Sequence, residues 1–117
     1  MTAGVIDILI DQGSVWNYQV TYQDPSGNPI NLTGYSAKMQ LRSLPSDPHA
    51  ALTLSSQNGD IVITGALGQI NITASSTATG AVDEGTYYYD LEVTDTVSNQ
   101  VTRIIQGQAV VSAEVTQ

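Results

Sequence analysis

The chain has 117 residues, a length that suits one domain with one hydrophobic core. It contains no cysteine, which excludes disulfides and thiolate-bound metals. Only three residues are basic, against 11 acidic ones, and the net charge is −8. Because a phosphate backbone is held by clustered Lys and Arg, we expect neither nucleic acid nor a membrane as a partner.

Two further observations concern targeting and organisation. No apolar run approaches the roughly 20 residues of a membrane-spanning helix. The first residues, 1–4, lack the basic flank and long apolar stretch of a signal peptide. We expect a single domain over residues 1–117, with short mobile ends at 1–4 and 116–117.

Apolar and polar residues alternate with a period of two in the N-terminal half, which predicts strands. A first strand is predicted over residues 5–11 and a clearer one over 14–24. The large apolar residues of the second strand share one face: Trp16, Tyr18, Val20 and Tyr22. Side chains alternate across a strand, so this face is expected to pack in the core, with Trp16 at its centre.

Turn chemistry separates the next strands. The segment 24–29 combines two prolines with Gly, Asp and Asn, and it predicts a turn before a strand over 35–42. The proline-containing segment 44–49 predicts a loop. Short strands are expected around three pairs of apolar residues: Leu52 and Leu54, Ile61 and Ile63, and Ile70 and Ile72. Turns are predicted at 58–60 and 65–68, and residues 75–80 form at best one helical turn.

The C-terminal part predicts two longer strands. One spans 87–94, with Tyr87 and Tyr89 on one face and Tyr88 on the other. The last runs from about 101 to 115, and its inward residues are expected to be Ile105, Gly107, Ala109, Val111 and Ala113. Arg103 breaks this alternation and Ile104 is adjacent to Ile105, which indicates a β-bulge.

Eight or nine short strands at about ten-residue spacing predict an all-β fold, an immunoglobulin-like antiparallel β-sandwich. No helix of useful length is expected.

Catalytic and metal-binding patterns are weak. His49 lies in a proline-containing loop and has no nucleophile motif beside it, so we interpret it as an ordinary loop residue. We interpret the carboxylate pair Asp83–Glu84 as part of a turn. The pair Asp90–Glu92 is interpreted as part of an exposed strand face. Candidate calcium ligands lack a spaced loop motif and read as turn formers: Asp60, Asp83 and Asp95. We therefore expect no enzyme activity, no catalytic residue, no cofactor and no metal.

Four residues are candidate partner contacts. Tyr88 points away from its aromatic neighbours, and Tyr is enriched in protein interfaces. The three cations of the chain lie at outward positions: Lys38, Arg42 and Arg103. An alternative interpretation of the aromatic residues is a sugar-stacking platform, as in a carbohydrate-binding or adhesion domain.

Several segments together resemble a known group of proteins. Residues 13–16, the alternating strand after them, and the stretch DPSGNPINLTGYSAKMQLR at 24–42 resemble small tail-associated modules of bacteriophages, such as the N-terminal domain of phage baseplate upper proteins. The segments GTYYYDLEV at 85–93, VTR at 101–103 and VVSAEVT at 110–116 fit the same pattern. The resemblance covers about residues 5–116.

The resemblance implies a β-sandwich that docks onto other virion structural proteins, and it supplies no catalytic residue. We therefore expect a virion structural protein, a tail, baseplate or fibre-attachment component assembled in the host cytoplasm, present as a homo-oligomer or symmetric assembly. Capsid decoration is the alternative within the same class.

Overall fold

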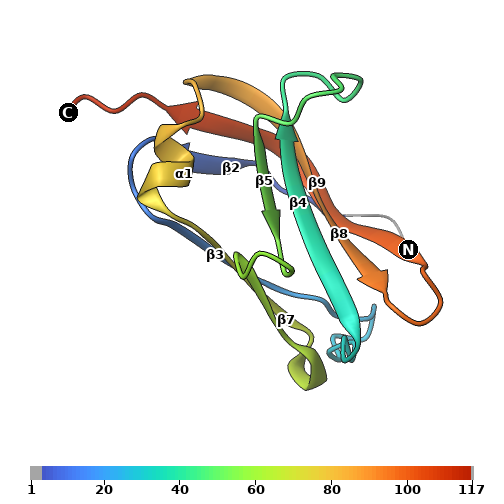
Figure 1. Ribbon diagram of the computed structural model, residues 1–117. Coiled ribbons are helices and arrows are strands. Elements are labelled where there is room, and N and C mark those ends of the chain that lie inside the picture. Colours follow the sequence, from blue (N-terminus) through green and yellow to red (C-terminus); the bar gives the residue numbers. More distant parts are fainter. Residues whose placement is uncertain (1–3, 117) are drawn as a thin grey trace.

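The computed structural model describes residues 4–116, which form two β-sheets packed face to face (Figure 1). The strands in this part of the chain are β1 (Gly4–Val5), β2 (Ile8–Asp11), β3 (Trp16–Thr21), β4 (Tyr35–Arg42), β5 (Leu52–Ser55), β6 (Ile61–Thr64), β7 (Gln69–Ala74), β8 (Gly85–Asp95) and β9 (Val101–Ser112). The larger sheet has the order β1-β9-β8-β4-β5, with β2 also paired to β9, and the smaller sheet has the order β3-β7-β6. The predicted all-β, immunoglobulin-like sandwich is confirmed.

Helical structure within residues 4–116 is confined to two short pieces. A 3₁₀ turn, η1 (Gly65–Leu67), joins β6 to β7, and α1 (Ser76–Gly80) follows β7. The Ser75 hydroxyl caps α1 by accepting a hydrogen bond from the Ala78 N–H at 3.1 Å. Within residues 4–116, no helix has the length and apolar character needed to cross a bilayer.

The turn before β4 forms for the reason that the sequence suggests. The Asp24 carboxylate accepts hydrogen bonds from the backbone N–H groups of Ser26 and Asn28, both at 2.9 Å. Gly27 adopts a φ of +85°, a conformation that costs glycine little. The reversal at residues 24–28 is therefore held by hydrogen bonds within the turn itself.

The core between the sheets is mainly aliphatic. Leu41, Leu91, Ile70 and Ala109 are fully buried at its centre. Trp16 was predicted to occupy that centre, and this is wrong. Trp16 faces the core but is only half-buried, because β3 lies at the edge of the smaller sheet. Its ring instead stacks on Tyr18, with centroids 5.6 Å apart and planes 8° from parallel.

The first predicted strand is divided in two. β1 and β2 are separated by Ile6 and Asp7, and both run parallel to β9, whereas every other strand pairing is antiparallel. Gly4, which was expected in a mobile end, lies in β1 and pairs with Ile105 of β9. The mobile ends expected at 1–3 and 117 lie outside the described residues.

The break between β1 and β2 passes closely over β9. A Cβ atom at Gly107 would lie 2.3 Å from the Ile6 carbonyl oxygen, so no larger residue fits there without moving the backbone. The Tyr89 hydroxyl donates a hydrogen bond to the same Ile6 carbonyl, and the Gln108 N–H donates to the Asp7 carboxylate at 3.0 Å. These contacts attach the N-terminal segment to the larger sheet.

The predicted bulge in β9 is confirmed. The β8–β9 register shifts between Leu91, which pairs with Ile105, and Glu92, which pairs with Arg103. Ile104 is the extra residue, and both isoleucines are buried. The bulge therefore turns Arg103 to the outer face of the sheet.

The end of β9 differs from the prediction. The strand ends at Ser112 rather than near residue 115, and Ala113 is exposed instead of facing the core. Residues 113–116 do not pack against the other sheet, so the alternation of apolar residues there buries no side chain.

A tyrosine corner completes the immunoglobulin-like features. The Tyr87 hydroxyl at the start of β8 donates a hydrogen bond to the Asp83 carbonyl four residues upstream, at 2.6 Å. In immunoglobulin domains the second cysteine lies two residues after this tyrosine. Tyr89 occupies that position here, and its hydroxyl holds the N-terminal segment as described above.

We expect Gly107→Ala to destabilise the protein by about 1–3 kcal/mol, because the added methyl group overpacks against the Ile6 backbone. Gly4→Ala is the matched control on the same pair of strands. Its added Cβ would meet Ile104 and Ile105 atoms at 3.8 Å, which is ordinary contact. Urea unfolding measures both variants, and equal losses of stability would contradict the close approach at Gly107.

Candidate functional site

The four candidate contact residues lie on one surface, the outer face of the larger sheet. Lys38 and Arg42 project from β4, Tyr88 from β8 and Arg103 from β9. Arg42 lies directly opposite Tyr88 in the strand register, and Glu92 lies opposite both Lys38 and Arg103. Every cation of the chain is therefore on this face.

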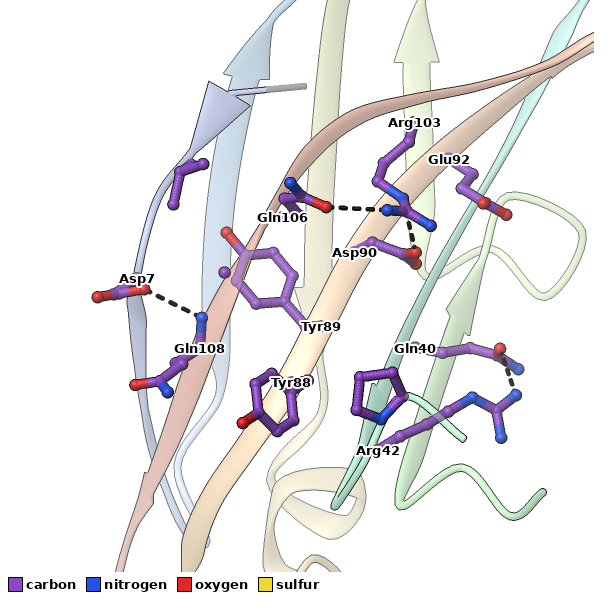
Figure 2. A pocket seen from close by; sticks show the side chains of 13 residues that line it. Asp7, Gln40, Arg42, Tyr88, Tyr89, Asp90, Glu92, Arg103, Gln106 and Gln108 are labelled. Carbon is purple, nitrogen blue, oxygen red and sulfur yellow. Dashed lines mark hydrogen bonds and ion pairs between the residues drawn. The ribbon is translucent and has the colours of Figure 1, made fainter. Parts of the chain in front are cut away.

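Arg103 is held in place by two neighbours. Its Nε atom lies 3.1 Å from an Asp90 carboxylate oxygen, and one of its terminal nitrogens donates to the Gln106 amide oxygen at 2.9 Å (Figure 2). Both charged side chains of the pair are partly exposed, and such pairs contribute little to stability. The contacts orient the guanidinium along the sheet surface.

Arg42 is bonded to neutral acceptors only. Its guanidinium donates to the Asp47 backbone carbonyl at 2.7 Å. It also donates to the Gln40 amide oxygen at 2.8 Å (Figure 2). In the part of the chain that the structure describes, no carboxylate lies within ion-pair distance of Arg42 or of the exposed Lys38. Both cations are consequently available to an external anion.

The same face is hollowed. A shallow cavity of about 490 Å³ lies over β8 and β9, between the β1–β2 break and the loop after β4 (Figure 2). It is lined by Val5, Asp7, Gln40, Arg42, Pro45, Tyr88, Tyr89, Asp90, Glu92, Arg103, Gln106, Gly107 and Gln108. We call this surface, together with Lys38, the docking face.

Exposed apolar side chains border the hollow. Tyr88 is 43% exposed, and Val5 is more exposed still. Leu9 on β2 pairs with Val110 on β9, and both are exposed on the same side of the sheet. The docking face thus combines an aromatic ring, aliphatic groups and guanidinium groups, which is the composition of a protein-binding surface.

The acids on this face are poorly placed for catalysis. Asp90 is occupied by Arg103, and Glu92 lies between Arg103 and Lys38 in the register. His49 is exposed in the loop between β4 and β5, where its backbone N–H donates to Asp47 at 2.9 Å. Among residues 4–116, no three His, Cys, Asp or Glu side chains converge as a metal site would require.

Sequence reasoning missed the rim of the hollow. Val5 and Asp7 reach it because the N-terminal segment pairs with β9, some 100 residues later in the chain. Pro45 reaches it from a loop that the sequence marks only as irregular. The single available signal was the glycine at 107 in the interior of a predicted strand, which is typical of close backbone approach.

Burial changes the acidity of one tyrosine beneath the hollow. Desolvation raises the pKa of Tyr89 to about 12, and the nearby Tyr18 and Asp7 contribute in the same direction. The neutral phenol is the form that donates a hydrogen bond to Ile6. Ionisation of Tyr89 would therefore weaken the attachment of the N-terminal segment.

The order of the strands, the paired sheets and the tyrosine corner define an immunoglobulin-like domain. A solved structure with this architecture is that of the NK cell receptor NKp44, described as a triggering partner in natural cytotoxicity. It superposes with a TM-score of 0.55 at 12% identity, over 96% of this chain and 100% of that chain. At this identity the likeness concerns the fold alone. No protein-family model matches the chain, and no curated protein does.

We expect stability to fall as pH rises above about 10, the ordinary tyrosine pKa, until Tyr89 itself ionises near 12. The sign follows from the raised pKa, since the unfolded chain loses this proton first. Tyr89→Phe should flatten the decline, whereas Tyr88→Phe, an exposed neighbour on the same strand, should leave it unchanged. Urea unfolding between pH 8 and 12 tests this, and identical profiles for the two variants would count against it.

Proposed function

We propose that this protein is a non-catalytic docking module that binds another protein through the docking face. The observation that carries the proposal is the collection of every cation of a chain with net charge −8 on one hollowed sheet face, beside the exposed ring of Tyr88. Lys and Arg residues placed only for solubility would be spread over the surface, whereas all three lie on this face.

The chemistry of the face supports a partner with carboxylates. Neither Arg42 nor Lys38 forms an ion pair within the described residues, and a guanidinium binds a carboxylate through two parallel hydrogen bonds. Tyr88 and Arg42 lie opposite each other in the register and form the centre of the contact. Tyr and Arg are the residue types that most often dominate binding energy in interfaces.

The resemblance to phage tail modules supports placing this docking in a virion. The partner is then another structural subunit of the tail, baseplate or fibre, met during assembly in the host cytoplasm. Repeated copies around a particle would give many identical contacts, so each of them can be individually weak.

The test is capture of a subunit from disrupted particles. We expect the immobilised protein to retain a tail or baseplate subunit, identified by mass spectrometry. Arg42→Glu and Tyr88→Ala should each weaken that complex by at least about tenfold in Kd, measured with the purified subunit. Loss at both residues would support docking through this face.

Two control variants lie on the opposite sheet. Thr64→Glu adds an acid and Val62→Ala removes an exposed apolar side chain, both on β6, and neither should change Kd. Capture of the major shell protein alone would favour capsid decoration. Binding of glycans alone, or equal losses for all four variants, would overturn the proposal.

A further inference from the structure

The smaller sheet has an edge that nothing covers. β3 pairs with β7 along one side only, and no strand within residues 4–116 pairs with its other side. β1 and β2, the strands that precede β3 in the chain, lie on β9 in the other sheet. The trace in Figure 1 shows β3 at the margin of the sandwich.

The free side of β3 offers backbone hydrogen-bonding groups. Just after the strand, the Tyr22 N–H donates to the Gly68 carbonyl at 2.8 Å, on the side of β7. Backbone groups alternate in direction along a strand, so Asn17, Gln19 and Thr21 direct theirs away from β7. These three residues are exposed. Another extended strand can therefore bind along this edge.

β3 lacks the usual protection of an edge strand. Natural edges are interrupted by charged residues, proline or bulges, or are kept very short. β3 contains six residues without any of these, and it is longer than the strands at the other sheet edges, β1, β2, β5 and β6. The whole segment from Gln12 to Gln23 carries no charge. An edge of this kind is expected to be covered in the working assembly.

The charge distribution identifies what covers it. Residues 61–82, which hold β6, β7 and α1, also contain no charged side chain, so the entire smaller sheet is neutral in a chain with net charge −8. Two copies of such an acidic chain repel each other over most approaches. At the β3 edge they can meet without placing carboxylates in contact.

We propose that two copies of the chain pair through β3, antiparallel and related by a two-fold axis, so that the two smaller sheets become one continuous sheet. The alternation of residues along β3 fits such a pairing. Its polar residues lie on the outer face, where Asn17 already accepts a hydrogen bond from Thr73 at 3.0 Å. Its inner residues Trp16 and Tyr18 are half-buried and would be covered further by the copy.

The pairing leaves the docking face free, because that face belongs to the larger sheet. The dimer and the proposed docking are therefore separable. If no partner is captured, the dimer can still be tested. If the protein is monomeric, docking through the larger sheet can still be tested.

Sedimentation equilibrium over a wide concentration range tests the dimer. We expect the wild type to approach twice the 12.4 kDa chain mass. The double variant Asn17→Lys/Gln19→Lys places like charges opposite each other across the two-fold axis, and the dimer Kd should rise by at least about tenfold. The added lysines lower the net negative charge and therefore weaken the general repulsion between copies. That effect alone would lower the dimer Kd, so a rise in Kd reports the local contact.

The matched control is Asn71→Lys/Thr73→Lys on β7, the middle strand of the same face, with the same change in net charge. It should dimerise as the wild type does, and circular dichroism should show both double variants folded. A wild type that remains at 12.4 kDa into the millimolar range overturns the inference. So does equal dimerisation of the two double variants, or a dimer that Arg42→Glu dissociates instead.

Discussion

The attachment of the N-terminal segment to β9 determines most of what is distinctive in this domain. Parallel pairing of β1 and β2 with β9 is possible because Gly107 leaves room for the Ile6 carbonyl, which the Tyr89 hydroxyl then binds. A side chain at residue 107 would push the segment away from the sheet. The same attachment builds one rim of the hollow on the docking face and keeps β1 and β2 in the larger sheet, so neither pairs with β3. One close backbone contact thus shapes both proposed interaction surfaces.

The two sheets differ in their chemistry. The larger sheet carries the cations together with Asp90 and Glu92, and the smaller sheet carries amides and hydroxyls without a single charge. A net charge of −8 discourages contact between copies in general. The two surfaces avoid that repulsion in different ways. The docking face carries positive charges, and the β3 edge carries no charge. The two proposed contacts therefore use different surfaces and do not compete.

Local patterns in the sequence predicted the strands well, because alternation and turn residues act over a few positions. β4 was predicted with its observed bounds, and the bulge at Ile104 was visible as two adjacent apolar residues. The outward placement of Lys38 and Arg42 followed from their even spacing along one strand. These features depend only on which face of a strand is buried.

Features that depend on strand neighbours could not be predicted. Nothing near residue 5 indicates that β1 lies beside residue 105, so the split of the first strand and the rim of the hollow were missed. Trp16 was placed at the core centre because its own strand alternates cleanly. Its actual exposure depends on β3 being an edge strand, which the sequence of β3 does not encode. Ala113 was misplaced because alternation continues in the sequence after the sheet has ended.

Tyr89 stands where immunoglobulin domains carry the second cysteine of their inter-sheet disulfide. The position here holds a buried ring whose hydroxyl binds the N-terminal segment, and no covalent cross-link joins the two sheets. The stability of such a domain does not respond to thiol reductants, and its unfolded chain is not constrained by a closed loop. The fold can consequently form in both reducing and oxidising compartments. A pulling force can extend the unfolded chain to its full length, because no disulfide closes a loop in it.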